Sequence, residues 1–345
     1  MKTYRLAMIG FGNVGQGFAQ ILHECAEELA HAFGAKFQIV AVSDLRKGSV
    51  YAPYGLPAAD LLNAVQTNGS FEKLSAFYRG WDGLETITKS DADVIVETSY
   101  TDLVTGGDGL DYIRAALKQG KHVVTTNKGP IALAYPELSA IARQQGVELG
   151  VEGTVMSGTP ALRLGQELLA GAGITHIQGI LNGTTNYILT QMESGDSYQD
   201  ALADAQARGF AEADPTGDVE GYDTAGKVVI LANLLMGASL KMDDIDRQGI
   251  TQISSMDIRA AQDAGERWKL IGRIERANGT VQASVRPIRL PLTHPLAGVN
   301  GAMNAVTFTT ALLGDVTLEG PGAGRVETGY ALLADLVAIH RRIMG

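Results

Sequence analysis

The sequence predicts an α/β protein in which a doubly wound parallel sheet is followed by a second, α+β domain. From the N-terminus to about residue 145, short and continuously apolar runs alternate with helical patterns, which is typical of parallel strands buried on both faces. Beyond this point, strand-like segments and helices follow in mixed order. Because 345 residues exceed the usual size of one domain, we expect residues 1–145, joined by a returning segment 320–345, to form one domain and 146–319 the other.

The expected elements of the first domain follow in chain order. A buried strand over residues 4–9 leads through a glycine-rich turn into a helix from about residue 14 to 32. The next strand, FQIVAVSD, ends at Asp44. After a polar, irregular stretch to about residue 89, ADVIVETS predicts a third strand, a helix follows near residues 109–119, and HVVTTNK predicts a fourth strand.

The expected elements of the second domain are less regular. Strands are predicted at HIQGILNG, TVQASVRPIRL and NAVTFTTALLG, with helices over residues 197–207 and 222–236. The last segment begins with the glycine-rich turn GPGAG and continues as a helix. We find no internal repeat, low-complexity tract or long linker in the sequence.

Composition argues against several classes of partner. The formal net charge of −10 gives an acidic surface, which repels nucleic-acid phosphates and anionic lipid. The single cysteine, Cys25, rules out an internal disulfide and fits a reducing compartment. The N-terminus does not have the pattern of a secretion signal, and no apolar run approaches the roughly 18 residues of a membrane span. The sequence therefore predicts a cytoplasmic protein without nucleic-acid or membrane partners.

The turn GFGNVG lies between the first predicted strand and the first predicted helix. Its Gly10, Gly12 and Gly15 form G-x-G-x-x-G, which permits a tight turn, close approach of the backbone to a pyrophosphate, and packing of the helix on the strand. Together with Asn13 and Val14, these glycines open a helix whose N-terminal N–H groups attract phosphate. This context predicts a Rossmann-like dinucleotide-binding domain.

The end of the second predicted strand bears on the choice of dinucleotide. Asp44 stands where an acidic residue normally accepts hydrogen bonds from the adenine ribose, and a long first helix explains why it comes later than the usual spacing of about 20 residues. Arg46 and Lys47 follow after Leu45 and could hold a 2′-phosphate. The sequence therefore predicts NAD or NADP as the cofactor without deciding between them.

Lys227, within EADPTGDVEGYDTAGKVVILAN, allows several interpretations. A phosphate-binding loop is disfavoured, because no strand precedes this G-x-x-x-x-G-K and Val228 replaces the Ser or Thr that would bind magnesium. A calcium loop would put Lys227 where a carboxylate ligand is required. Asp223, four residues earlier, fits a surface ion pair on a helix. However, the face of Lys227 continues into apolar residues one turn further on, which predicts a partly buried lysine with a catalytic or structural role.

A lysine and carboxylates in this arrangement suit hydride-transfer chemistry. Hydride transfer to or from nicotinamide needs a proton donor or acceptor at the substrate oxygen, and a lysine whose pKa is lowered by burial can serve. Glu212 and Asp223 would bind a cationic group such as an ammonium, which indicates an amino-acid substrate. Lys128, ending HVVTTNK, would point toward the nicotinamide, because ligands bind at the carboxyl ends of such strands. The alternative interpretation of Lys128 is a surface lysine at a strand end.

Several motifs follow one another in a fixed order along nearly the whole chain. They are IGFGNVGQG, ETSYTD, GKHVVTTNKGPIA, VEGTVMSGTPAL, ILNGTTNYIL, GFAEADPTGDVEGYDTAGK, HPLAGVNGAMNA and GPGAG. Together they resemble the motifs of the homoserine dehydrogenase family. The resemblance implies reversible interconversion of L-aspartate 4-semialdehyde and L-homoserine with NAD(P)H, a step in threonine and methionine biosynthesis. It also implies a homodimer or a higher homo-oligomer.

The resemblance implies roles for individual residues around the substrate. Lys227 is similar to the proton-transferring lysine of the family and Lys128 to its second active-site lysine, both near the reacting carbonyl oxygen. The amino group of the substrate would be held by the carboxylates of Glu212 and Asp223, and Asp218 would complete this acidic pocket. The substrate-side turn of the family corresponds to Asn182, Gly183 and Thr184.

Further positions are implied for the cofactor and for a monovalent cation. Thr98 and Ser99 follow the third strand and would contact the dinucleotide. The same role is implied before the last helix for Gly322, Ala323 and Gly324. A sodium or potassium ion would be held, largely by backbone oxygens, at Glu152, Val155, Ser157 and Thr159.

The chain departs from the family pattern in three places. It ends at Gly345, so the C-terminal regulatory domain of many members, and with it threonine feedback, should be absent. The last helix opens with RVETGYALLADL instead of the usual small residues, which leaves local cofactor contacts open. The basic residues that follow Asp44 keep the preference between NAD and NADP open.

Other functions stand as alternatives at this point. A related dehydrogenase acting on another hydroxy amino acid would keep all of these motifs. A catalytically idle NAD(P)-binding sensor would need the glycine turn, but not Lys128, Lys227 and the carboxylates together. An NTPase would hydrolyse nucleoside triphosphates. The sequence shows no zinc-ligand spacing among its six histidines and one cysteine, and no nucleophile-elbow serine.

Overall fold

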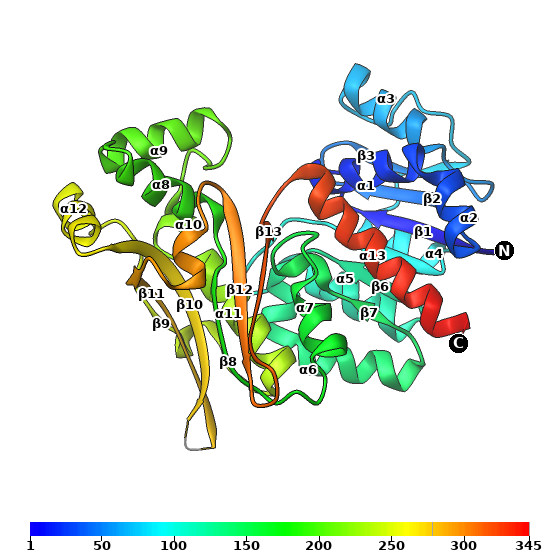
Figure 1. Cartoon of the computed structure of the whole chain (residues 1–345). Helices are drawn as coiled ribbons and strands as arrows, with labels where there is room; N and C mark the ends of the chain where they lie inside the picture. The colour runs from blue at the N-terminus through cyan, green and yellow to red at the C-terminus, as the bar shows by residue number, and fades with distance from the viewer. Residues whose placement is uncertain (278, 345) are drawn as a thin grey trace. The chain divides into compact units, whose positions relative to one another are not determined.

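The computed structural model describes residues 1–277 and 279–344, which form two compact units, each with its own sheet (Figure 1). The first unit comprises Met1–Gly158 together with Gly324–Gly345, and the second comprises Thr159–Ala323. The first unit therefore takes its last helix from the far end of the chain.

The first unit is built on a seven-stranded sheet with the strand order β4-β3-β2-β1-β5-β6-β7. From β2 to β7 in this order the neighbours pair in parallel, which confirms the doubly wound sheet predicted from their apolar runs. Strands β3 and β4 extend one edge in the antiparallel direction. The strands are β1 Lys2–Ile9, β2 Ala35–Asp44, β3 Gly48–Tyr51, β4 Tyr78–Arg79, β5 Val94–Glu97, β6 His122–Thr125 and β7 Leu149–Gly150.

Helices cover both faces of this sheet. The last helix, α13, packs against α1, while α5 packs against α4 and α6. The contact between α1 and α13 is close because both helices present glycine there, and a Cβ at Gly17 would lie 2.0 Å from the carbonyl oxygen of Arg325. The helices are α1 Asn13–Glu24, α2 Ala26–Phe33, α3 Ala58–Asn68, α4 Gly83–Lys89, α5 Gly107–Lys118, α6 Lys128–Gln145, η1 Glu152–Thr154 and α13 Arg325–Met344.

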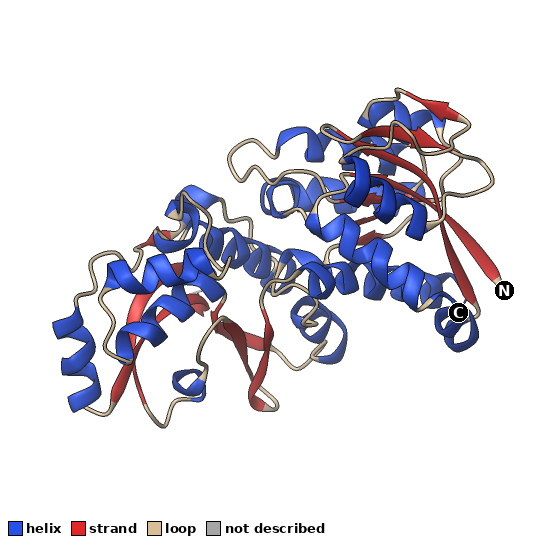
Figure 2. Cartoon of the chain, turned by 90° about the horizontal axis from the view of Figure 1, so that it is seen from above, coloured by secondary structure: helices blue, strands red, loops and turns tan. Residues whose placement is uncertain are grey.

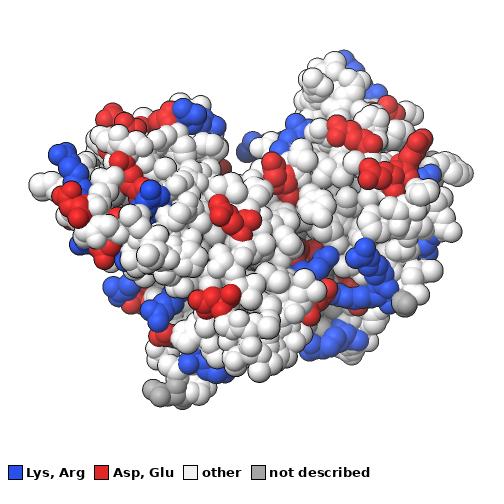
Figure 3. Space-filling view, in the orientation of Figure 1, with Lys and Arg blue, Asp and Glu red and all other residues white. Residues whose placement is uncertain are grey.

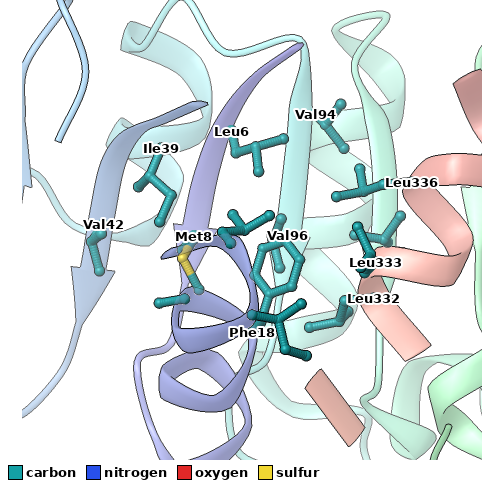
Figure 4. Packing of buried hydrophobic residues seen from close by; sticks show 14 of the residues in the cluster. Leu6, Met8, Phe18, Ile39, Val42, Val94, Val96, Leu332, Leu333 and Leu336 are labelled. Carbon is teal, nitrogen blue, oxygen red and sulfur yellow. The ribbon is translucent and has the colours of Figure 1, made fainter. Parts of the chain in front are cut away.

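The core of the first unit lies between the sheet and the helices α1 and α13 (Figure 4). Alternate side chains of β1, among them Leu6 and Met8, face Phe18 of α1, and Leu332 of α13 joins the same cluster. These four side chains have no more than 1 % of their surface exposed. Burial of this size supplies the main driving force for folding and fixes the carboxyl edge of the sheet.

Two expectations for the first unit were wrong. The long helix expected from about residue 14 to 32 is broken at Cys25, whose φ of −109° ends α1 and starts α2. The stretch between Asp44 and Lys89, expected to be irregular, contains β3, α3, β4 and α4. Short edge strands and a helix with few buried residues leave little apolar periodicity in the sequence, so these elements gave no signal.

The second unit is built on a six-stranded sheet with the order β13-β12-β8-β10-β11-β9. Figure 2 shows strands and helices together in this unit. Its pairs are antiparallel except for β11 with β9, which confirms the expected α+β architecture. The strands are β8 Ile174–Ile180, β9 Asp246–Arg247, β10 Glu266–Ala277, β11 Thr280–Pro291, β12 Met303–Thr310 and β13 Gly314–Pro321. The helices are α7 Ala161–Arg163, η2 Leu164–Leu168, α8 Gly183–Glu193, α9 Tyr198–Ala207, α10 Thr216–Val219, α11 Tyr222–Met236, η3 Met242–Asp244, α12 Ser255–Asp263 and η4 Pro295–Gly298.

Helix α11 lies close against this second sheet. A Cβ at Gly272 of β10 would come 2.6 Å from Val228 of α11, so only glycine allows this approach. Another apolar cluster joins Ile271 of β10 to Leu296 and Val299 at η4. Helix α11 is thereby held by its apolar residues, and its first two turns carry Asp223 and Lys227.

Acidic and basic side chains are scattered in small groups over the face shown in Figure 3, and the described residues form no single large basic patch on that face. Within residues 1–277 and 279–344, no helix combines the length and the apolar character needed to cross a lipid bilayer.

Candidate active site

The glycine turn after β1 has the geometry of a pyrophosphate cradle. Gly10 has φ +90°, and a Cβ there would lie 2.5 Å from the carbonyl oxygen of Thr98, so no other residue fits. A Cβ at Gly15 would lie 3.0 Å from the carbonyl oxygen of Gly10. At Gly12, the N-cap of α1, no atom lies within 4 Å of an added Cβ. The first and third glycines therefore serve packing, while the second leaves open space in front of the N-terminus of α1.

Asp44 closes the cradle on the side of β2. Its Oδ2 accepts from the backbone N–H of Phe11 at 2.8 Å, and its Oδ1 accepts from those of Arg46 and Lys47 at 3.0 Å each. Burial acts to raise the pKa of Asp44, but these backbone N–H groups and the charge of Lys47 lower the pKa overall. Asp44 is therefore an anion tied to the glycine turn, and Arg46 is exposed.

The segment after β5 is held by a buried carboxylate that the sequence reasoning missed. Glu97 has 0 % of its surface exposed and accepts from the N–H of Ser99 at 2.8 Å and from Thr125 Oγ1 at 2.8 Å. Thr98 Oγ1 donates to the carbonyl oxygen of Gly10 at 3.0 Å. The predicted Thr98 and Ser99 therefore lie at the glycine turn. A glutamate that ends an apolar strand was the available signal for Glu97.

Lys128 occupies the first position of α6 rather than the end of a strand. Strand β6 ends at Thr125, and Asn127 caps the helix by accepting from the N–H of Gly129 at 3.3 Å. The Asn127 Nδ2 donates to the carbonyl oxygen of Tyr100 at 3.3 Å, which ties the start of α6 to the segment after β5. Lys128 is therefore placed at the carboxyl edge of the sheet, as the sequence predicts, but by a helix N-terminus.

Lys227 is buried in the first turns of α11, with 6 % of its surface exposed. Its Nζ donates to Asp223 Oδ2 at 2.7 Å and to the carbonyl oxygen of Leu181 at 2.5 Å. Helix α11 begins after Gly221, whose φ of +81° allows the chain to turn into the helix. The interpretation of a solvated surface pair is therefore wrong, because both the lysine and its carboxylate partner are largely withdrawn from water.

An amide links two carboxylates beside this lysine. Asn182 Nδ2 donates to Asp218 Oδ1 at 2.6 Å and to Asp223 Oδ2 at 3.0 Å. Asn182 is itself fixed as the N-cap of α8, because its Oδ1 accepts from the N–H of Thr185 at 2.9 Å. Burial, and then the charge of Asp223, raise the pKa of Asp218. We call Asn182, Asp218, Asp223 and Lys227 the acid–lysine cluster.

The neighbouring predicted substrate residues occupy different positions. A Cβ at Gly183 would lie 2.6 Å from the carbonyl oxygen of Ala302, so the turn needs glycine. Thr184 Oγ1 donates to the carbonyl oxygen of Phe210 at 2.5 Å and anchors the following loop. Glu212 lies exposed in that loop, where Gln206 Nε2 donates to its backbone carbonyl at 3.0 Å. The structure thus brings the acid–lysine cluster together, but it does not place the Glu212 carboxylate in it.

The charges of the acid–lysine cluster indicate what it would bind. Two carboxylates and one ammonium leave one formal negative charge in a partly desolvated place. An incoming ammonium group would neutralise this charge and relieve the repulsion between Asp218 and Asp223. Lys227 would meanwhile present a proton donor or acceptor within the same cluster. The arrangement therefore suits proton transfer on a substrate that carries an amino group.

The residues named for a monovalent cation lie on one continuous segment. Met156 and Ser157 both have φ +58°, a left-handed conformation that costs energy in residues other than glycine and turns successive carbonyl groups. Glu152 is buried, and Val155 has 0 % of its surface exposed. Thr159 begins the second unit, and its Oγ1 donates to the carbonyl oxygen of Pro321 at 3.0 Å. Carbonyl and carboxylate oxygens are the donors that hard cations prefer, so the residue types fit.

The last predicted cofactor residues follow β13 in the second unit. A Cβ at Gly322 would lie 2.1 Å from Cγ of Asn304, so the backbone of this turn rests on the Asn304 amide and needs glycine. Ala323 is the last residue of the second unit, and Gly324, with φ +142°, is the first of the returning segment.

Comparisons with known proteins identify the family. Residues 10–152 match the family model described as "Homoserine dehydrogenase, NAD binding domain", and residues 160–337 match the one described as "Homoserine dehydrogenase". The chain belongs to the homoserine dehydrogenase family. It is an NAD(P)-dependent oxidoreductase.

Individual relatives resemble the chain over nearly its whole length. The "NAD(+)-dependent homoserine dehydrogenase" of Pseudomonas canavaninivorans is 47 % identical over 342 residues, which cover 99 % of this chain and 97 % of that protein. A crystal structure of a putative homoserine dehydrogenase from Archaeoglobus fulgidus is 38 % identical, with a TM-score of 0.89, over 98 % of this chain and 99 % of that one. A hyperthermophilic archaeal homoserine dehydrogenase in complex with NADPH is 26 % identical, with a TM-score of 0.85, over 99 % and 98 % of the two chains.

Proposed function

We propose that the acid–lysine cluster carries out the substrate side of the interconversion of L-homoserine and L-aspartate 4-semialdehyde. The observation that supports it most directly is the buried Lys227 Nζ, held 2.7 Å from Asp223 and 2.5 Å from the Leu181 carbonyl oxygen. The first unit, by this proposal, binds the dinucleotide, and the second unit binds the substrate.

The proton movements follow from this arrangement. In the reducing direction, the Lys227 ammonium donates a proton to the carbonyl oxygen of the aldehyde, which becomes the hydroxyl of homoserine. In the oxidising direction, the neutral Lys227 amine accepts the hydroxyl proton. Lys128 is proposed as a second donor to the same oxygen. The bound nicotinamide supplies or accepts the hydride at its C4 atom.

The substrate is oriented by charge. Asp218 and Asp223 are proposed to hold its α-ammonium group, and the Asn182 amide keeps their carboxylates apart and aligned. Glu212, which is exposed on its loop, is proposed to hold the same group together with Asp223, and Thr184 and Gly183 shape the turn beside the cluster. The substrate-side residues would therefore select an amino alcohol over a plain alcohol.

The cofactor is proposed to lie on the glycine turn. Gly10, Gly12, Asn13, Val14 and Gly15 would hold its pyrophosphate against the N-terminus of α1. Thr98 and Ser99 would contact the nicotinamide half, and the family resemblance implies Gly322 and Ala323 as further contacts of the dinucleotide. The ionised Asp44 carboxylate can accept hydrogen bonds from both ribose hydroxyls of NAD, which supports NAD as the cofactor. Arg46 and Lys47 would instead attract the 2′-phosphate of NADP and reduce its repulsion by Asp44.

Two further features belong to the proposal. Glu152, Val155, Ser157 and Thr159 would hold a sodium or potassium ion, which would fix the backbone of this segment. The chain is also proposed to form a homodimer or a higher homo-oligomer in the cytoplasm, which the family resemblance supports. Light scattering during size-exclusion chromatography would measure the oligomer directly.

The test is the absorbance of reduced nicotinamide with purified protein, L-homoserine, and NAD or NADP in parallel. The proposal predicts reduction of the cofactor with L-homoserine and much slower reduction with the same alcohol lacking the amino group. Equal rates with the two alcohols would contradict the role of Asp218 and Asp223. Reduction with another hydroxy amino acid but not with L-homoserine would move the assignment to a related dehydrogenase.

A further inference from the structure

A third lysine, outside the acid–lysine cluster, is completely buried in the second unit. Lys269 of β10 has 0 % of its surface exposed. Its Nζ donates to Asn186 Oδ1 at 3.0 Å and to the carbonyl oxygen of Val299 at 2.6 Å, and Asn300 Oδ1 lies 3.5 Å away. Lys269 thus joins strand β10, helix α8 and the loop after η4 at one atom.

Helix α8 is attached to that loop at several points. Asn186 Nδ2 donates to the carbonyl oxygens of Val299 and Met303 at 3.2 and 3.1 Å. One turn further along the helix, Thr190 Oγ1 accepts from the N–H of Gly301 at 3.1 Å. Asn186 therefore uses both ends of its amide, the nitrogen toward the loop and the oxygen toward Lys269. Side-chain hydrogen bonds thus tie this loop to α8.

These contacts lie on the same helix face as the substrate turn. Asn182, Asn186 and Thr190 are spaced four residues apart, so their side chains follow one stripe along α8. Asn182, at the start of this stripe, donates to both carboxylates of the acid–lysine cluster. The loop also reaches the first turn of α8, where Gly183 packs against the carbonyl oxygen of Ala302. The position of the loop therefore sets the position of the Asn182 end of the helix.

Stability alone does not explain a lysine at this place. Burial lowers the pKa of Lys269 to about 8, and the Glu193 carboxylate only partly opposes this effect. Glu193 also carries a desolvation cost, because burial raises its pKa and its Oε1 is buried without a hydrogen-bond partner. An unbranched apolar side chain would avoid these desolvation costs. The lysine instead provides directional hydrogen bonds, since its ammonium donates to Asn186 Oδ1 and to the carbonyl oxygen of Val299.

We propose that Lys269 is a positioning residue for the reaction: it fixes α8 against the loop of residues 297–303 and thereby aims the Asn182 amide between Asp218 and Asp223. The proposal rests on the proposed substrate role of these two carboxylates. Lys269 touches neither substrate nor cofactor and acts only through Asn186 and the start of α8.

The main test compares Lys269→Met with Ile274→Ala, measuring thermal unfolding and steady-state kinetics of the full chain for both. Ile274 is a buried residue of the same strand, five positions from Lys269 and therefore on the opposite face of the sheet, so its truncation should lower stability without removing the Lys269 contacts to α8 and the loop. We expect Lys269→Met to lower kcat/KM for L-homoserine about 10-fold or more, since small misplacements of positioning groups are costly. The KM for the dinucleotide should stay unchanged. Ile274→Ala should melt earlier with wild-type kinetic constants.

A double variant separates positioning from packing. In Lys269→Met with Asn186→Leu, no buried amide oxygen is left unpaired, but the carbonyl oxygens of Val299 and Met303 lose their side-chain donors, so stability should recover only in part relative to Lys269→Met. If Lys269 positions the cluster, kcat/KM for L-homoserine stays low in the double variant. Recovery of both stability and kcat/KM would overturn the proposal, and so would normal kinetics in the single variant.

A milder variant covers the case in which these proteins do not fold. Thr190→Val removes the bond from the Gly301 N–H and the bond that Thr190 Oγ1 donates to the Asn186 carbonyl oxygen within α8, and it leaves no buried charge. It should lower kcat/KM for L-homoserine by a few fold, and unchanged kinetics would contradict the coupling between α8 and the loop. Lys227→Ala is measured in parallel. If Lys227→Ala is inactive while the Lys269 variants have normal kinetics, the positioning proposal is wrong and the proposed function still stands. If Lys227→Ala is fully active, the proposed function itself fails.

Discussion

Replacement of Lys269 by methionine should change how the stability of the second unit depends on pH. The pKa of Lys269 is lowered from 10.5 to about 8 by burial, with Glu193 raising it and Arg267 lowering it further. Below pH 8 both the folded and the unfolded chain hold the proton, so the native state carries the full burial cost. Between about pH 8 and 10.5 the unfolded chain holds more protons, and stability must rise with pH.

The size of this effect follows from the shift. A pKa difference of about two and a half units corresponds to roughly 3 kcal/mol, taking 1.36 kcal/mol per unit. The free energy of unfolding of the wild type minus that of Lys269→Met should therefore increase by roughly 3 kcal/mol from pH 8 to 10.5. Glu193 changes the stability in the opposite direction. Because its pKa is raised in the folded chain, the free energy of unfolding falls as pH rises above 4.5, the ordinary pKa of a glutamate.

The assay is urea unfolding at several pH values, followed by the fluorescence of Trp268. This tryptophan neighbours Lys269 in β10, and its Nε1 donates to the carbonyl oxygen of Asp257 at 3.1 Å. The only other tryptophan, Trp81, lies in the first unit, so a Trp81→Phe background makes the signal report on the second unit alone. A stability difference that stays constant from pH 8 to 10.5 would refute the reasoning, because Lys269 would then titrate alike in both states.

Four further variants test the two sites. Asp223→Asn removes the carboxylate 2.7 Å from Lys227 and should lower kcat/KM for L-homoserine by roughly 10²-fold, with dinucleotide affinity unchanged in a fluorescence titration. Gly10→Ala should lower the melting temperature, since its Cβ would lie 2.5 Å from a carbonyl oxygen. Gly12→Ala should keep the normal melting temperature and raise the KM for the dinucleotide. The reverse pattern would contradict the packing assigned to these two glycines. Asp44→Ser should shift the ratio of kcat/KM values toward NADP, and an unchanged ratio would show that this carboxylate does not set cofactor preference.

The parts of the fold that could be predicted are those in which burial and sequence period agree. The strands β1, β2, β5 and β6 are continuous apolar runs because both of their faces are covered, and such runs are visible in the sequence. The glycine turn was predictable because Gly10 and Gly12 serve different steric needs at a fixed spacing. Lys227 and Asp223 could be paired from their helical spacing alone.

Other features depend on tertiary contacts that no local pattern records. Strand β10 escaped prediction because its charged Arg267 and Lys269 interrupt the apolar run, and one of them is fully buried against α8. The break at Cys25 has neither glycine nor proline to mark it. Glu212 was grouped with Asp223 by sequence, but the loop between α9 and α10 holds it in solvent. In each case the neighbours that decide the outcome are distant in sequence.

Whether Lys227 moves the proton is tested by the turnover of Lys227→Met beside that of Lys121→Met. Lys121 is also partly buried, and its Nζ donates to the carbonyl oxygen of Ser90 at 2.7 Å, but it lies outside both sites. With L-homoserine and saturating dinucleotide, we predict that Lys227→Met loses roughly 10²-fold or more in kcat while binding the dinucleotide normally. Lys121→Met should turn over like the wild type. A kcat of Lys227→Met near that of the wild type would contradict the central claim that Lys227 moves the proton.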